Sequence, residues 1–299
     1  MNKHFSRIAL VGKVEDARVA DSLAALATHL RAKGLTVFLD REARIEGLPD
    51  GLVRKAVAEL GKEADLIVAI GGDGTMLFAA QLALGRRVPL FGVNRGRLGF
   101  LTDVLPDDMI GNVDAVLEGR YETDERQMLA ARLSLADGQE LDYRALNDVV
   151  VQRHESGRMV ELEVWIDGCF VNTHGGDGLV VASSTGSTAY ALSCGGPIIH
   201  PSLRAIVIAP ISPHTLSDRP IVVRRESRIE IRLVERSGSR AQVTCDGVIF
   251  GDLEPSSHLL IEPAVEGITL LHPPGHDYFR LLRSKLHWGR SGRSGGEEH

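Results

Sequence analysis

The sequence predicts an α/β domain followed by a mainly antiparallel β domain. In the first third of the 299 residues, short apolar runs alternate with stretches of helical spacing, which is typical of a parallel sheet with helices. Beyond about Thr123, the runs instead alternate in polarity and are separated by Asp-Gly and Gly-Gly pairs, which are hairpin signals. A chain of this length is long enough for two domains with sizeable cores.

The first part is predicted to be Rossmann-like, with apolar strands and amphipathic helices in turn. Strands are expected at Arg7–Lys13, Leu35–Asp40, Ala64–Ile70 and within Arg87–Asn94, and helices at Asp16–Lys33 and Leu52–Leu60. Gly34 stands where a helix cap belongs. In such sheets ligands bind beyond the carboxyl ends of the strands, so those loops are the first candidates for a site.

The change of pattern sets the predicted domain boundaries. Residues 1–124 form the α/β domain and residues 125–271 the β domain. A helix at Tyr278–Gly289 is expected to return to the first domain, so that residues 272–289 pack on it. Residues 290–299 are polar and glycine-rich and are expected to be a disordered tail.

Composition argues against several classes of partner. The net charge is −6, which gives no field to attract nucleic acid or an anionic membrane. No stretch is long and apolar enough for a signal peptide or a membrane span. The three cysteines are far apart and odd in number, so we expect no disulfide framework and a cytoplasmic protein.

One motif after the third strand combines three glycines with a carboxylate: Gly71-Gly72-Asp73-Gly74-Thr75. Glycines let a ligand approach backbone N–H groups, and a helix starting near Thr75 would favour phosphate there. The motif matches neither the Walker A loop nor the dinucleotide fingerprint. The alternative is that Asp73 or Thr75 merely caps the helix while the glycines turn the chain.

Two further segments each leave two interpretations open. Asn94–Thr102 follows the fourth strand and is either an ordinary loop with solvated Arg95 and Arg97 or a ligand-lining loop that brings positive charge to phosphates. Asn147 and Asp148 precede an apolar run and are either a turn device or a pair that hydrogen-bonds a ribose or adenine.

The segment Gly175–Pro201 is the most informative. It begins with a second Gly-Gly-Asp-Gly, which contains Asp177, and continues with hydroxyl residues unsuited to a hydrophobic core: Ser183, Ser184, Thr185, Ser187 and Thr188. This composition favours a polar ligand lining over a plain loop.

Three other chemistries are disfavoured. Ala191–Gly195 resembles a nucleophile elbow, but a hydroxyl-rich loop precedes it instead of a strand. Cys194 has no basic neighbour in sequence and is expected to be an inert buried thiol. His272 and His276 have no evident carboxylate or cysteine partner, so a zinc site is not expected.

Together, and in this order and spacing, the four motifs resemble the NAD kinase family, with the resemblance running from about Ile8 to Gly289. Lipid kinases that act on diacylglycerol or sphingosine share the first motif, and phosphofructokinases approximate it. The segment around Asp177 to Pro201 is far more specific.

The resemblance implies that the γ-phosphoryl group of ATP is transferred to the 2′-hydroxyl of the adenosine ribose of NAD, giving NADP. It also implies a divalent metal ion, usually Mg²⁺, with unknown ligands, and a homodimer or homotetramer. The resemblance makes Asp73 the proton acceptor. A carboxylate is too weak a base to remove a ribose proton outright, so its role is to orient the hydroxyl and accept the proton late.

The remaining expected contacts follow from the same motifs. Phosphates are expected at Gly71, Gly72, Gly74 and Thr75. NAD is expected at Asp73, Gly74, Asn147, Asp148, Arg158, Asp177, Thr188, Ala189, Tyr190, Ala191, Leu192 and Ser193. The chain departs from the family at Gly175–Gly176, where a basic residue is common, and at Val248, where glutamine is common.

Two functions from other classes compete with this interpretation. A lipid kinase would use the first motif on a hydrophobic acceptor, although it has no use for the hydroxyl-rich segment. A non-catalytic NAD sensor would bind NAD without forming NADP from ATP.

Overall fold

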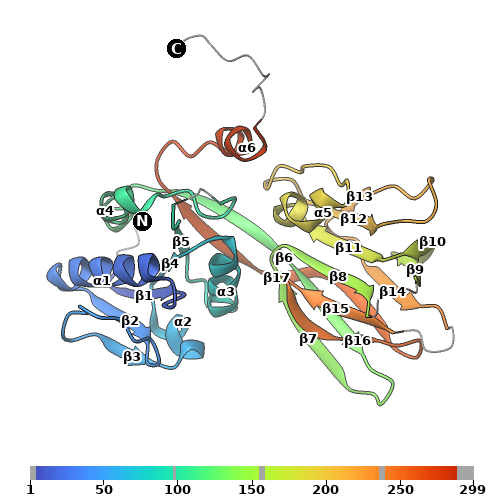
Figure 1. The fold of residues 1–299 in the computed structure, drawn as a ribbon, viewed down its shortest axis with the longest axis horizontal. Coiled ribbons are helices and arrows are strands. Elements are labelled where there is room, and N and C mark those ends of the chain that lie inside the picture. Colours follow the sequence, from blue (N-terminus) through green and yellow to red (C-terminus); the bar gives the residue numbers. More distant parts are fainter. Residues whose placement is uncertain (1–4, 97–98, 155–158, 236–239, 288–299) are drawn as a thin grey trace, which may run out of the picture. The chain divides into compact units, whose positions relative to one another are not determined.

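The computed structural model describes residues 5–96, 99–154, 159–235 and 240–287. It divides into two compact units, one of Met1–Asp124 with Thr269–His299 and one of Glu125–Ile268. We call them the α/β unit and the β unit (Figure 1). Strand β17 (His258–His272) passes from the β unit into the α/β unit.

The α/β unit contains a parallel sheet in the order β5-β4-β1-β2-β3, and the last residues of β17 pair with β5 in parallel. Its strands are β1 (Arg7–Gly12), β2 (Thr36–Asp40), β3 (Val53–Lys55), β4 (Leu66–Ile70) and β5 (Leu90–Val93). Its helices are α1 (Ala17–Ala32), η1 (Val57–Glu59), α2 (Leu60–Glu63), α3 (Asp73–Ala83), η2 (Pro106–Asp108), α4 (Met109–Leu117) and α6 (Tyr278–Leu286).

Helices lie on both faces of this parallel sheet. Phe91 and Val93 belong to the core that α1 and α4 complete. Gly92 between them points the other way, where a Cβ atom would lie 3.1 Å from the sulfur of Met76 in α3. The predicted α/β class and its parallel sheet are therefore confirmed.

One predicted helix is wrong. Residues Leu52–Leu60 form the short strand β3, the single turn η1 and only the first residue of α2. Val53, Arg54 and Lys55 pair with Phe38, Leu39 and Asp40 of β2. Sheet pairing therefore overrides the helical spacing, which is a weak preference in so short a segment.

The β unit is mainly antiparallel, as predicted, and its strands belong to two sheets. One has the order β13-β12-β11-β8-β15-β16, and the other contains β10-β9-β14-β17, with β6 pairing with both β17 and β7. The elements are β6 (Glu122–Ser134), β7 (Glu140–Ala145), β8 (Asp148–Arg153), β9 (Val160–Ile166), β10 (Cys169–Gly176), β11 (Gly178–Ser183), η3 (Thr185–Thr188), α5 (Tyr190–Ser193), β12 (Ala205–Ile211), β13 (Ile221–Arg224), β14 (Ile229–Leu233), β15 (Ala241–Cys245) and β16 (Val248–Leu253).

The two sheets of the β unit enclose one core, and a smaller core lies on the other face of the six-stranded sheet. Val149 and Val151 of β8 face the first core, whereas Val150 faces the second. Ala191 of α5 belongs to the second core, which holds the hydroxyl-rich segment against the sheet.

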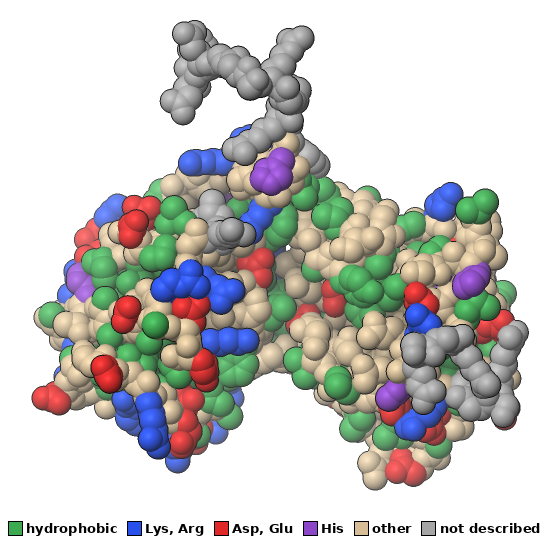
Figure 2. Space-filling view, viewed as in Figure 1, with side chains coloured by type: hydrophobic (Ala, Val, Ile, Leu, Met, Phe, Trp, Pro, Cys, Tyr) green, Lys and Arg blue, Asp and Glu red, His purple; other side chains and the backbone are tan. Residues whose placement is uncertain are grey.

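The surface carries no strong segregation of charge on the face that Figure 2 shows, where acidic and basic side chains are interspersed over the α/β unit. Among the residues described above, no helix has both the length and the apolarity needed to cross a bilayer.

Candidate functional site

The first motif forms the corner between β4 and α3. Strand β4 ends at Ile70, and α3 begins at Asp73 with Gly72 as its N-cap. The helix thus begins two residues before Thr75, close to the predicted start, but Thr75 lies almost fully buried inside the first turn and is not the cap. The N–H groups of Gly71 and Thr75 donate to the carbonyls of Val93 and Gly72, so the donors that this corner offers to a ligand are the N–H groups at the start of the helix, from Gly72 to Gly74.

Asp73 is held by the loop that follows β5. Its carboxylate accepts hydrogen bonds from the backbone N–H groups of Phe100, at 2.9 Å, and Leu101, at 3.0 Å. A Cβ atom on Gly99 would overlap the same carboxylate. The side chain therefore does not cap its own helix, and its orientation depends on a loop 27 residues away.

The glycines of this corner serve two different purposes. A Cβ atom on Gly71 would overlap Thr75, so the fold itself requires glycine at that position. A Cβ atom on Gly72 or Gly74 would meet no atom within 4 Å. At these two positions the space beside the backbone is open to a ligand.

The loop after β5 is tied down by its own side chains. Asn94 donates to the hydroxyl of Thr102 at 2.7 Å and accepts from the N–H of Gly96 at 3.0 Å. Arg95 pairs with Asp16 at 3.3 Å, and Arg97 lies outside the described residues. The loop's role in the structure is thus to hold Asp73 in place.

The β unit contains a second cluster around Asn147 and Asp148. Asp246 accepts hydrogen bonds from the N–H groups of Leu146 at 2.8 Å, Asn147 at 2.7 Å and Asp148 at 3.2 Å. Sequence reasoning missed Asp246, whose only local signal is its Asp-Gly pair at the β15–β16 hairpin. Asp246 fixes the backbone from which both candidate side chains project.

Asp148 is a buried carboxyl group. Burial raises its pKa to about 7, the nearby Asp246 adds to the rise, and the N–H of Tyr190 partly offsets it. Burial also raises the pKa of Asp246, against the effect of its three backbone donors. At neutral pH this cluster therefore carries less negative charge than two ordinary aspartates.

Asp177 and Tyr190 lie near the same cluster. Asp177 forms an ion pair with Arg153 at 2.9 Å. The pKa of the Tyr190 hydroxyl is raised by burial, and then by the charges of Cys194, Asp177 and Asp148. The structure thus brings Asp148, Asp177 and Tyr190 together, although they span 43 residues of sequence.

The hydroxyl residues are used differently from the expectation. Ser183 donates to the carbonyl of Leu146, and Ser184 and Ser187 donate to backbone carbonyls within the same region. The interpretation of these three hydroxyls as a ligand lining is therefore wrong, because their hydrogen bonds to backbone carbonyls hold the η3–α5 segment in place within the β unit. Of the expected NAD contacts in this segment, Thr188 ends η3, Tyr190–Ser193 form α5, and Ala189 lies between them. Arg158 lies outside the described residues.

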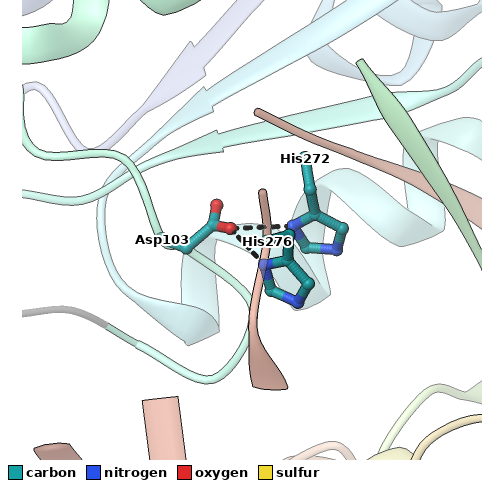
Figure 3. Close-up of side chains that lie close together, drawn as sticks. All are labelled: Asp103, His272 and His276. Carbon is teal, nitrogen blue, oxygen red and sulfur yellow. Dashed lines mark hydrogen bonds and ion pairs between the residues drawn. The ribbon is translucent and has the colours of Figure 1, made fainter. Parts of the chain in front are cut away.

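A third cluster joins Asp103 to His272 and His276 in the α/β unit (Figure 3). The Nδ1 atoms of His272 and His276 lie 2.9 Å and 2.7 Å from the same carboxylate oxygen. Burial acts to raise the pKa of Asp103, but hydrogen bonds from both histidines outweigh it and hold the pKa well below its usual range. The expectation that these histidines lack a carboxylate partner is wrong.

Comparison with known proteins agrees with this arrangement. The model of the ATP-NAD kinase N-terminal domain matches residues 19–121, and that of the ATP-NAD kinase C-terminal domain matches residues 146–271. A NAD kinase of Methylococcus capsulatus is 44% identical over 290 residues, which cover 96% of this chain and 99% of the relative. A NAD kinase of Thiobacillus denitrificans is 45% identical over 287 residues, which cover 96% and 98%.

Solved structures show the same fold. A NAD kinase from Archaeoglobus fulgidus in complex with ATP has a TM-score of 0.73 and 27% identity, with 94% of this chain and 98% of that chain covered. Yeast NADH kinase complexed with NADH has a TM-score of 0.90 and 24% identity, with 98% and 91% covered. Because both domain models match and the relatives are similar over almost their whole length, this chain belongs to the NAD kinase family.

Proposed function

We propose that this chain transfers the γ-phosphoryl group of ATP to the 2′-hydroxyl of the adenosine ribose of NAD, producing NADP. The observation that carries the proposal is the β4–α3 corner, where a fixed carboxylate stands beside two glycines that face open space. That corner provides both parts of phosphoryl transfer, which are backbone donors for phosphate and a group that positions the acceptor hydroxyl.

Asp73 is the catalytic residue of this proposal. Two backbone N–H groups fix the direction of its carboxylate, and each oxygen keeps a lone pair that can accept the ribose proton. Gly71, Gly72, Gly74 and Thr75 supply the phosphate-binding corner. The positioning of the hydroxyl precedes proton transfer, which occurs late in a loose transition state.

NAD binds, in this proposal, through Asp73 and Gly74 and through residues of the β domain, residues 125–271. Asn147 and Asp148 provide an amide and a carboxyl group on a backbone that Asp246 holds. Asp177 and Tyr190 stand close to Asp148. The other proposed contacts are Arg158, Thr188, Ala189, Ala191, Leu192 and Ser193.

We propose Mg²⁺ as the divalent ion, which neutralises phosphate charge when ATP is bound. Mg²⁺ prefers oxygen ligands and is commonly held by one or two carboxylates plus substrate phosphates. The corner fits that preference, because the carboxylate oxygens of Asp73 are possible metal ligands beside the open space at Gly72 and Gly74. A homodimer or homotetramer in the cytoplasm completes the proposal, and light scattering after size exclusion measures the oligomer.

A coupled assay tests the function. The full chain is incubated with NAD, ATP and Mg²⁺, and NADP is read out with a NADP-specific dehydrogenase. We expect NADP formation that depends on ATP, and no phosphorylation of diacylglycerol presented in vesicles. Binding of NAD without NADP formation, with ATP or with polyphosphate as donor, would instead identify a non-catalytic NAD sensor.

A further inference from the structure

The Asp103–His272–His276 cluster stands apart from the residues that the proposed reaction uses. It draws on the loop after β5, the end of β17 and the chain that leads into α6. One ligating atom from each residue lies within 4.8 Å of the other two. Figure 3 shows both imidazole rings directed at the carboxylate.

We propose that Asp103, His272 and His276 form a binding site for a divalent first-row transition metal, with Zn²⁺ as its best-suited ion. Two imidazole nitrogens and one carboxylate oxygen are ligands that Zn²⁺ and Fe²⁺ favour, whereas Mg²⁺ prefers oxygen alone. The proposed ion is therefore chemically distinct from the one that accompanies ATP.

The geometry needs only a small adjustment to accept the ion. Zinc lies about 2.0–2.2 Å from such ligands, so neighbouring ligand atoms of a tetrahedral site are about 3.4 Å apart. The two nitrogen–oxygen distances here are 2.9 Å and 2.7 Å, and they would lengthen by about 0.5 to 0.7 Å. On binding, the metal takes the place of the Nδ1 protons that lie between each ring and Asp103, so a neutral ring carries its proton on Nε2 instead, and only a ring that was protonated on both nitrogens releases a proton to solvent.

Neighbouring groups orient His272, whereas the side of the cluster beside His276 opens to a cavity. His272 is only 2% exposed, and its Nε2 atom lies 3.6 Å from a carboxylate oxygen of Asp124. A carboxylate behind a histidine ligand commonly sets its tautomer and orientation. The two rings are stacked, with centroids 3.8 Å apart and planes inclined by 18°, which limits ring rotation.

An adjacent cavity can supply the remaining coordination. Asp103 and His276 line a cavity of about 430 Å³, whose wall also includes Asp108, Asn112 and Ser284. Three protein ligands beside this cavity leave a fourth position for water, as in open zinc sites. Binding would join the loop after β5 to the segment before α6.

Metal titration of the full chain tests the proposal. After chelator treatment, Zn²⁺ binding to wild type, His276→Asn and Asp103→Asn is measured by competition with a chromophoric chelator. His258→Asn, an exposed histidine at the start of β17, is the matched control. We expect one more equivalent of Zn²⁺, at micromolar affinity or tighter, in wild type and His258→Asn than in the other two, with Mg²⁺ unable to compete.

Cobalt provides a second measurement that needs no variant. Co²⁺ bound by two nitrogens and one oxygen in a tetrahedral or five-coordinate site gives visible absorption bands, which Zn²⁺ should abolish in equal stoichiometry. Equal zinc binding in all four folded proteins would overturn the proposal. The cluster would then only hold the loop after β5 and the segment before α6 together by hydrogen bonds. If the variants fail to fold, wild type without these bands would overturn it equally.

Discussion

The same four residues, Gly-Gly-Asp-Gly, occur at 71–74 and at 175–178 and build two different structures. The first copy is the N-terminus of α3, whereas the second connects β10 of one sheet to β11 of the other. Asp73 is held by backbone N–H groups, whereas Asp177 is held by Arg153. The residues after each copy decide the outcome, since the first copy leads into a helical pattern and the second into the apolar strand Gly178–Ser183.

The glycines differ in the same way. Gly178 has a φ of +155°, and a Cβ atom there would overlap the carbonyl of Val151 in β8. Its counterpart, Gly74, faces open space. The fold therefore requires glycine at position 178, whereas at position 74 it leaves room for the proposed ligand.

The largest expected effect is on catalysis by the first copy. Asp73→Asn should lower kcat by at least about 10²-fold and leave NAD binding nearly intact, because the amide cannot accept the ribose proton. The assay is steady-state kinetics together with NAD binding by calorimetry. Near-normal kcat in this variant would remove Asp73 from its proposed role, and its melting temperature serves as the folding control.

The paired substitutions Gly178→Ala and Gly74→Ala separate fold from function. Gly178→Ala should destabilise the protein by about 1–3 kcal/mol or more, because the backbone conformation and Val151 both oppose a side chain. Gly74→Ala should keep or slightly raise stability, since alanine favours helix, and should raise the KM for ATP. Thermal unfolding and ATP titrations measure both, and a reversed order of stability would refute the contrast.

The carboxyl group beside the second copy predicts a pH effect. Asp148 has a pKa of about 7 in the folded protein, against 3.8 as its ordinary value. Between these pH values the folded state holds the extra proton, so this group's contribution to stability is lost as pH rises. Asp148→Asn should remove a slope of at most about 1.4 kcal/mol per pH unit.

Urea unfolding of wild type and Asp148→Asn at pH 5, 6, 7 and 8 measures that slope. Asp246, Tyr190, Cys194 and Cys245 lie near Asp148 and remain in both proteins, so the difference between the two curves reports Asp148 together with its electrostatic coupling to these groups. A difference that does not change with pH would contradict the raised pKa.

The smallest expected effect is at the second aspartate itself. Asp177→Asn removes an ion pair whose side chains are 34% and 36% exposed, so the loss of stability should be below about 1 kcal/mol. We expect a higher KM for NAD with kcat largely kept, measured in the coupled assay. A fall in kcat as large as that of Asp73→Asn would erase the distinction between the two copies.

Much of the α/β unit follows from local patterns. Helix α1 has Asp16 as its N-cap, and Gly34 follows it with a φ of +79°, both where the sequence predicts helix ends. The backbone of the β4–α3 corner is likewise encoded locally, because an apolar strand, glycines and a helical pattern follow one another in the sequence. The prediction of a helix at Leu52–Leu60 was wrong because pairing with β2 outweighs the local preference of this segment for helix.

The sequence by itself determined the fold class and the family, since both rest on local patterns and motifs of neighbouring residues. Only the tertiary structure decided that Phe100 and Leu101 hold Asp73, that Asp246 holds the backbone 98 to 100 residues earlier, and that Asp103 joins two histidines about 170 residues later. The physical reason is that hydrogen bonds between distant segments depend on which strands pair and where their ends meet, and no local pattern records that pairing.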